Sequence, residues 1–192
     1  MEEAKKGFTQ IVHKEPLKTS ISKEEHKKRP KAPIVTILDN IRARVNVGSI
    51  FRVSDAINVE KVYLTGFTSC PPQKKIAQIS RKVEEYVEWE YFENALELVK
   101  KLKKGGYTIY CLEQCKESQI ISNVNYKFPL AIIVGFEKEG VQDLLVEESD
   151  VIIQIPMLGM KESLNVSTAY AITAFEIAQS FYAKDFSNIP KI

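Results

Sequence analysis

Residues 34–52 read IVTILDNIRARVNVGSIFR, and this stretch decides the fold. Residues 34–38 form a β-branched apolar run, which is typical of a buried parallel strand. A polar loop follows at 39–45, and Asn46, a residue type that often caps helices, marks the expected start of a helix. Apolar residues then recur along one helical stripe, and Arg52 lies off that stripe. A strand that leads into a helix is the repeating unit of an α/β protein.

The same alternation continues along most of the chain. β-branched and aromatic runs predict further strands, and amphipathic runs predict further helices. The expected strands are residues 61–65, 86–92, 107–112, 130–134 and 151–155, and the expected helices are 93–104, 141–147 and 164–182. We therefore predict an α/β fold with a mostly parallel sheet flanked by helices.

Composition predicts an ordinary globular protein. The 192 residues, 44% hydrophobic and 27% charged, suit one compact domain with a short appendage. No stretch approaches the roughly 20 continuous apolar residues that a bilayer span requires. The first residues, MEEAKKGFTQ, hold no apolar core and no small-residue cleavage site, so we expect no secretory signal. Three cysteines cannot form a fully paired disulfide framework, which favours a reducing, cytoplasmic setting.

Positive charge gathers at the start of the chain. Residues 1–33 carry nine basic and five acidic side chains, a net of +4, which leaves −2 for the remainder of a chain whose total is +2. We expect a basic N-terminal extension at 1–32 and a folded domain at 33–192. The extension is either a solubilising arm or an electrostatic arm for a polyanion such as RNA, and composition leaves both open.

Several common kinds of site are absent from the sequence. The first strand is not followed by Gly-x-Gly-x-x-Gly, and no phosphate loop ends in Gly-Lys-Ser/Thr. Cys111 and Cys115 are four residues apart, Cys70 is distant, and both histidines precede residue 34, so no metal site is expected. The same histidine positions argue against Ser/His/Asp or Cys/His catalysis.

Three unusual loops remain, each directly after a predicted strand. They are residues 40–52, with the pattern Asn-x5-Asn-x-Gly-x3-Arg; 135–140, with Gly-x-Glu-x2-Gly; and 155–167, with Ile-Pro-Met-x-Gly-x3-Ser-Leu-Asn-Val-Ser. In an open α/β sheet, ligands bind in the crevice beyond the carboxyl ends of the strands. In type and order these loops resemble the three signature motifs of the SpoU/TrmH family of the SPOUT superfamily, and the resemblance covers about residues 34–182.

The resemblance implies an activity, a cofactor and an assembly. Family members use S-adenosyl-L-methionine to methylate a ribose 2′-hydroxyl of RNA, and we expect a structured RNA here, tRNA more than rRNA. The resemblance also implies a C-terminal trefoil knot. Knots are nearly absent from proteins, so the hydrophobic pattern of a sequence does not predict one. Members form homodimers through the knot region and the final helix, so each site is expected to be completed by the neighbouring subunit.

The resemblance also assigns site residues, position by position. Arg52 is expected to hold the adjacent phosphate and to stabilise the developing alkoxide, because a guanidinium rarely releases its proton. Asn46 and Asn165 are expected to hold the motif loops and to orient Arg52. Glu137 is expected to fix the loop geometry by accepting backbone hydrogen bonds, and Ser163 to cap the last helix or touch substrate. The expected cofactor contacts are Leu112, Glu113, Gly135, Ile155, Met157 and Leu164, with Gly135 admitting the adenosine. The expected RNA contacts are Arg42, Arg44, Lys27, Lys28 and Arg29.

Two departures from the family pattern leave an alternative open. Phe136 stands where the family has a small or polar residue, and residues 80–83 are bulkier and more basic than expected. The alternative is a catalytically inactive RNA-binding or assembly protein with the same fold. Taken singly, Asn46 is also explained as a helix cap, Glu137 as a surface carboxylate and Arg52 as a solvated residue.

Overall fold

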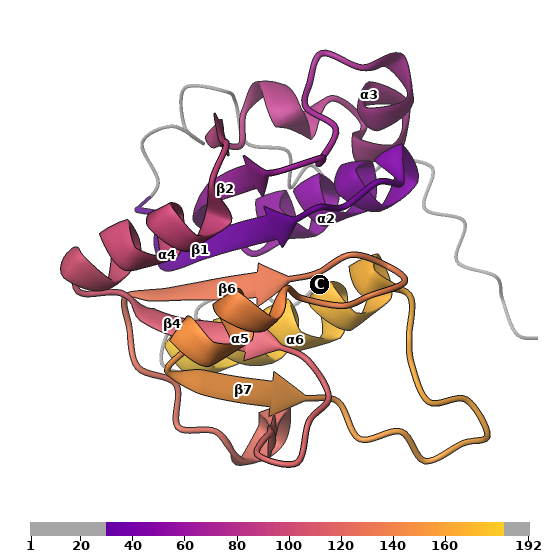
Figure 1. The fold of residues 1–192 in the computed structure, drawn as a ribbon. Helices are drawn as coiled ribbons and strands as arrows, with labels where there is room; N and C mark the ends of the chain where they lie inside the picture. Colours follow the sequence, from indigo (N-terminus) through magenta and orange to yellow (C-terminus); the bar gives the residue numbers. More distant parts are fainter. Residues whose placement is uncertain (1–29, 183–192) are drawn as a thin grey trace, which may run out of the picture. The chain divides into compact units, whose positions relative to one another are not determined.

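The computed structural model describes residues 30–182, and its centre is a seven-stranded sheet (Figure 1). The strands lie in the order β3-β2-β1-β6-β4-β7-β5, and every pairing between neighbours is parallel. Their bounds are β1 Ala32–Asp39, β2 Val59–Thr65, β3 Trp89–Phe92, β4 Thr108–Leu112, β5 Gln119–Ile120, β6 Leu130–Val134 and β7 Val151–Gln154. The predicted parallel α/β fold is therefore confirmed.

Helices cover both faces of this sheet (Figure 1). They are α2 Arg44–Ala56, α3 Lys74–Ser80, α4 Ala95–Lys104, α5 Asp143–Glu148 and α6 Val166–Tyr182, with two 3₁₀ turns, η1 Val83–Glu85 and η2 Ile121–Asn123. Side chains alternate along a strand, so Ile34 and Leu38 of β1 pack with α2 and α6, whereas Val35 and Ile37 pack with α4 and α5. The two apolar layers fix which strand ends meet at the site.

A buried trio of hydroxyl groups connects α6 to the rest of the fold. The Tyr170 hydroxyl lies 2.7 Å from Thr36 Oγ1 on β1 and 2.8 Å from Ser54 Oγ on α2. All three residues are fully buried, and burial raises the pKa of the Tyr170 hydroxyl. Buried polar groups require such partners, so the trio fixes how α6 lies against the sheet.

Several expected boundaries were wrong. Helix α2 begins at Arg44 with Ala43 as its N-cap, so Asn46 is not a cap and lies inside the helix, buried. The strand expected at 86–92 begins only at Trp89, because left-handed residues and a 3₁₀ turn precede it. The short helix α3 was not expected, since only two apolar residues, at 76 and 79, mark its inner face.

The last helix also starts later than expected, at Val166 instead of Leu164. Its cap is Asn165, whose side-chain Oδ1 accepts hydrogen bonds from the backbone N–H groups of Ser167 (3.0 Å) and Thr168 (3.3 Å). Ser163, expected as a possible cap, lies two residues before that position. An amide oxygen that reaches the second and third N–H groups of a helix is the usual N-cap geometry. Among residues 30–182, no helix combines the length and apolarity needed to cross a membrane.

Candidate active site

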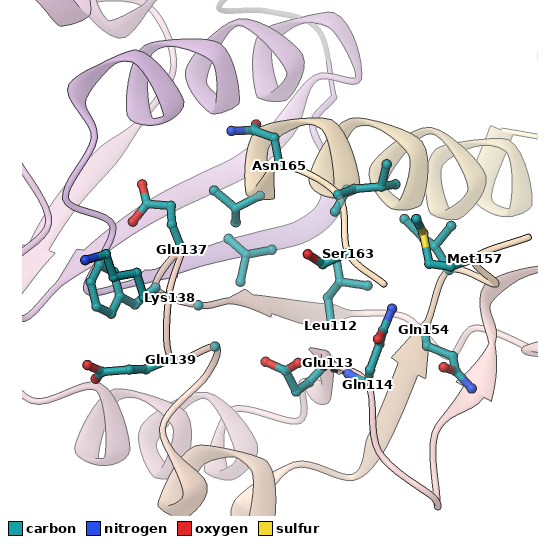
Figure 2. Close-up of a pocket in the computed structure, with 18 residues that line it drawn as sticks. Leu112, Glu113, Gln114, Glu137, Lys138, Glu139, Gln154, Met157, Ser163 and Asn165 are labelled. Atoms are coloured by element: carbon teal, nitrogen blue, oxygen red, sulfur yellow. Dashed lines mark hydrogen bonds between the residues drawn. The ribbon is translucent and has the colours of Figure 1, made fainter. Parts of the chain in front are cut away.

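A cavity of about 600 Å³ lies beyond the carboxyl ends of β4, β6 and β7 (Figure 2). Its walls come from four segments: residues 112–114 after β4, residues 134–140 after β6, residues 154–157 after β7, and residues at 163–169 where α6 begins. The second and third motifs therefore line one space, as the strand-end rule for α/β sheets requires. The volume is within the range of ligand pockets.

A chain of hydrogen bonds joins all three motifs. Asn165 Nδ2 donates to Asn46 Oδ1 at 3.0 Å, and Asn46 Nδ2 donates to Glu137 Oε1 at 2.7 Å. Glu137 also accepts from the backbone N–H groups of Ala43 (3.1 Å) and Arg42 (3.4 Å). Asn46 lies within helix α2, yet both polar atoms of its side chain form hydrogen bonds with residues of loops that are distant in sequence.

These contacts set the charge state of Glu137. Its burial favours the neutral acid, but hydrogen bonds from its own backbone, from Asn46 and from the backbone of residues 42 and 43 favour the carboxylate, and together they lower the pKa of Glu137 below 4.5. The bonds weaken when the carboxyl is protonated. The connection between the first and second motifs therefore depends on an ionised Glu137.

The second motif is a tight hairpin that requires its glycine. Phe136 and Gly140 exchange two backbone hydrogen bonds, of 3.0 Å and 2.9 Å. A Cβ atom on Gly135 would overlap the backbone of Gly140 and Val141. The close return of the hairpin on itself gives a structural reason for the glycine at 135. The expected contact between Gly135 and the adenosine of a cofactor stays a prediction.

Glu113 and Gln114, just beyond β4, hold the loops of the cavity together. The Glu113 carboxylate accepts hydrogen bonds from Val141 N (3.0 Å) and Gln114 N (2.9 Å), and Gln114 Nε2 donates to the Glu162 carbonyl at 2.9 Å. Sequence reasoning selected Glu113 but missed Gln114. The signal that could have identified Gln114 was its position just beyond the end of a predicted strand, where ligands bind in this class of fold.

All six expected cofactor contacts lie on the cavity. Leu112, Glu113, Gly135, Ile155, Met157 and Leu164 line it, as do Ser163, Glu137 and Asn165. The wall also holds Lys138, Glu139, Gly140 and Val166 of the second and third motifs, and four residues outside the motifs that the sequence did not single out: Gln114, Val134, Gln154 and Ala169. Phe136 contributes to the wall without closing the cavity.

Arg52 lies elsewhere in the single chain. It is exposed on α2 and lines a separate hollow with Phe175 of α6. Within residues 30–182 its guanidinium makes no hydrogen bond. Asn46 and Asn165 of the same chain therefore do not orient Arg52, although we expected that they would. Six helical positions separate Asn46 from Arg52, which places the two side chains about 120° apart around α2.

The expected RNA contacts are only partly described. Arg42 lies after β1 with its guanidinium 4.7 Å from the Phe136 ring centre and 5.9 Å from that of Phe67. Arg44 is exposed at the first residue of α2. Lys27, Lys28 and Arg29 lie outside the described residues. Among residues 30–182, no group of three metal-ligating side chains is found.

The lining suits a cationic ligand with apolar parts. Carboxylates at Glu113, Glu137 and Glu139 line the cavity beside a single ammonium group, that of Lys138. Leucine, isoleucine, valine and methionine side chains supply the apolar wall. An apolar pocket with a few convergent polar groups is the usual form of a small-molecule site.

Fold and site together define a class: a parallel α/β protein whose strand-end pocket is closed by three interlinked loops. The chain belongs to the SpoU rRNA Methylase family, whose model matches residues 33–175. It is 31% identical over 153 residues to the tRNA (guanosine(18)-2'-O)-methyltransferase of Thermus thermophilus, covering 80% of this chain and 78% of that protein. It is 29% identical to a 23S rRNA (guanosine-2'-O-)-methyltransferase of Ralstonia nicotianae, covering 75% of this chain and 57% of that protein.

Solved structures agree with the sequence comparisons. The crystal structure of the A. aeolicus TrmH/SpoU tRNA modifying enzyme superposes with a TM-score of 0.76 at 30% identity, covering 88% of this chain and 85% of the other. An AdoMet-bound rRNA methyltransferase from Sinorhizobium meliloti has the same fold, with a TM-score of 0.73 at 23% identity, covering 79% of this chain and 57% of that one.

Proposed function

We propose that this chain transfers a methyl group from S-adenosyl-L-methionine to a ribose 2′-hydroxyl of structured RNA, and that its substrate is a tRNA more than an rRNA. The observation that carries the proposal is the Asn165–Asn46–Glu137 chain of hydrogen bonds, which joins all three motifs beside one cavity. The tRNA preference is supported by the relatives: the Thermus tRNA enzyme is matched at slightly higher identity and over more of both chains than the Ralstonia rRNA enzyme.

The cavity fits the cofactor in size and charge. Its apolar residues, including Ile155, Met157 and Leu164, would hold the adenosine, and the carboxylates of Glu113 and Glu139 suit a ligand with two cationic groups. When bound, S-adenosylmethionine supplies a methyl group that is already electrophilic. The protein's own tasks are therefore to align the RNA hydroxyl and to help it lose a weakly held proton.

We assign the stabilising charge to Arg52. A guanidinium stays protonated, so Arg52 serves as a fixed cation that holds the neighbouring phosphate and stabilises the developing alkoxide. The proton passes to phosphate or water. Asn46, Asn165 and Glu137 position the loops, and Ser163 lies on the cavity wall, within reach of substrate.

A homodimer brings Arg52 to a cavity in this proposal. Arg52 does not line the cavity of its own chain but lies beside Phe175 of α6. On the same helix Ile172 is 43% exposed, Phe175 54% and Phe181 39%. Ile172 and Phe175 lie three residues apart, on one side of the helix, and their exposure favours an interface with a second copy. Phe181 packs against the Phe128 ring of its own chain. Ala178 of the same helix is buried in the chain's own core.

The remaining parts of the proposal follow the family. The chain between β7 and α6 would complete a C-terminal trefoil knot, and residues 1–32 would be a basic extension that adds phosphate contacts through Lys27, Lys28 and Arg29.

A cytoplasmic setting is supported by the three cysteines, Cys70, Cys111 and Cys115, which are all unpaired. Burial raises the pKa of the Cys111 thiol to about 12, so that thiol stays protonated.

Methyl incorporation tests the proposal directly. The purified full chain is incubated with methyl-labelled S-adenosylmethionine and either total tRNA or total rRNA, and the label is mapped by nuclease digestion. We expect label in a 2′-O-methylated nucleotide of tRNA. Label in rRNA alone would reverse the substrate preference. Binding of RNA and cofactor without any label would identify an inactive RNA-binding protein instead.

A further inference from the structure

A second hollow, of about 470 Å³, adjoins the cofactor cavity. The two share Phe136, Glu139 and Gly140 on their walls. The second hollow is otherwise formed by the loops after β1 and β2, by the segment that leads into α5 and by the first turn of α5. Of those residues only Arg42 is an expected RNA contact, and none has a role in the methyl transfer proposed above. Its other lining residues are Asn40, Arg42, Phe67, Val141, Gln142, Asp143 and Leu144.

Two aromatic rings flank a guanidinium at this hollow. The Arg42 guanidinium carbon lies 4.7 Å from the centre of the Phe136 ring and 5.9 Å from the centre of the Phe67 ring. Both distances are within the range of cation–π attraction, so the rings restrict where the guanidinium lies. The Phe67 side chain is 74% exposed, and Leu144 beside the same hollow is 59% exposed. An aromatic and cationic surface is thus left open to solvent.

The loop that carries Phe67 is held firmly. Asn40 has a left-handed backbone, and its Oδ1 accepts a hydrogen bond from Phe67 N at 2.9 Å. Gly66 also has a positive φ, and a Cβ there would overlap the Asn40 amide. The ring of Phe67 is therefore presented to solvent by a loop of fixed geometry, as binding surfaces commonly are.

The buried carboxylate of Asp39, at the end of β1, connects the loop after β1 to Gln142, which precedes α5 on the other side of the hollow. Asp39 is 1% exposed and accepts from Gln142 N at 3.2 Å and from Gln142 Nε2 at 2.7 Å. It also accepts from Asn40 Nδ2 at 2.9 Å. Burial raises the pKa of Asp39, and these hydrogen bonds limit the rise. The two walls of the hollow are consequently fixed relative to each other.

The charges at the hollow point to a base and not to a phosphate. Aromatic rings and guanidinium planes are the groups on which unpaired RNA bases stack. The carboxylates of Glu139 and Asp143 outnumber the one cation, Arg42, and repel a phosphate. Carboxylates accept hydrogen bonds, and they suit a base edge that carries donors. Guanine presents two adjacent donors, N1–H and the N2 amino group, which one carboxylate can accept together.

We propose that the hollow formed by Phe67, Arg42 and Asp143 binds an unpaired guanine of the substrate RNA. The base stacks on the Phe67 ring and the Arg42 plane, and its N1–H and N2–H groups donate to the rim carboxylates. The inference rests on the proposed RNA substrate. Because the hollow shares a wall with the cofactor cavity, a base held there places the RNA backbone near the site of methyl transfer.

Equilibrium binding tests this site without requiring catalysis. Fluorescein-labelled short uridine oligomers carry one central guanosine, one central inosine, which lacks the N2 amino group, or only uridine, and anisotropy reports their affinity. We expect Phe67→Ala to weaken binding of the guanosine oligomer by roughly 5- to 100-fold, as loss of one stacking ring does elsewhere. Phe67→Tyr should restore most of it. Ile120→Ala, an exposed apolar residue on β5, is the matched control and should bind as the unmodified chain does.

The edge contact is tested with Asp143→Asn. The unmodified chain should bind the guanosine oligomer several-fold more tightly than the inosine oligomer, and Asp143→Asn should reduce that ratio toward one. Equal affinity of the unmodified chain for all three oligomers, or an unchanged affinity of Phe67→Ala, would overturn the proposal. Methylation of total tRNA by the unmodified chain is measured in parallel. If no methylation is detected but the oligomers bind as expected, the proposed function is wrong and the proposed guanine site is still supported.

Discussion

Asn165 donates a 3.0 Å hydrogen bond from Nδ2 to Oδ1 of Asn46, although 119 positions separate the two residues. The same Asn165 side chain caps helix α6 through its Oδ1. One amide therefore performs two tasks, fixing the start of α6 and connecting the third motif to the first. The two tasks use different atoms, so substitutions can separate them.

Asn165→Asp should keep the cap and lose the connection. Aspartate caps helices about as well as asparagine, but it has no N–H to donate to Asn46. We expect thermal stability near that of the unmodified chain and methyl transfer reduced about tenfold or more, since small displacements of site loops are costly. Asn165→Ala should in addition lose roughly 0.5–2 kcal/mol of stability. Unfolding curves measure the stability and single-turnover rates measure the methyl transfer. Full activity in Asn165→Asp would show that the hydrogen bond from Asn165 to Asn46 is not needed for catalysis.

Two inactive variants should restore each other if the site is shared between protomers. Arg52→Ala should abolish methyl transfer while sparing cofactor affinity, and Leu164→Trp should block cofactor uptake by filling the cavity. After mixing and subunit exchange, roughly a quarter of the sites should combine an intact cavity with an intact Arg52. Turnover of the mixture checks this, and isothermal titration checks cofactor affinity of each variant. A mixture that stays inactive despite exchange would mean that Arg52 serves its own chain or none.

The sequence predicts the sheet better than it predicts the site's connections. The run at 130–134 is apolar throughout and bounded by proline and glycine, so its observed bounds follow from local pattern alone. Asn46 shows the opposite case. Its residue type predicts a helix cap, but its amide hydrogen-bonds a carboxylate 91 positions away, which no local pattern encodes. Phe67 gives no signal either, because a single aromatic residue in a loop belongs to no periodic pattern that would predict its exposure.

Gly135→Ala should disrupt the second motif. The added Cβ would overlap the backbone of Gly140 and Val141, which belongs to a tight hairpin and has no flexible side chain to move aside. We expect the hairpin to open and the cofactor affinity to fall at least tenfold, because that hairpin is one wall of the cavity. Gly159→Ala is the matched control, since nothing lies within 4 Å of the position that its Cβ would take. Isothermal titration with S-adenosylmethionine compares the two variants, and equal affinities would show that the hairpin can adjust.

Tyr170→Phe should destabilise the fold without touching the cavity. Removal of the hydroxyl deprives Thr36 Oγ1 and Ser54 Oγ of a buried partner, which costs about 1–3 kcal/mol. For a chain of this length the midpoint of thermal unfolding should fall by roughly 2–12 °C. Adding Thr36→Val and Ser54→Ala removes the unpaired groups and should recover part of the loss. Calorimetry measures all the variants, and a single variant as stable as the unmodified chain would mean that the trio contributes little.

Acid should break the link between the first and second motifs through Glu137. Its pKa is lower in the folded chain than its usual 4.5, so the folded state binds fewer protons than the unfolded chain near that pH. The carboxylate's contribution to stability is therefore fully present above about pH 4.5 and is lost as the pH falls through the lower, folded value. Glu137→Gln cannot accept charge-assisted hydrogen bonds and should unfold at a lower temperature than the unmodified chain at pH 7. The difference should shrink as the pH falls through the lower, folded pKa of Glu137, below which both side chains are neutral. Unfolding midpoints of the two proteins measured from pH 7 to pH 3 check the sign, and a difference that grows toward acid would refute this account of Glu137.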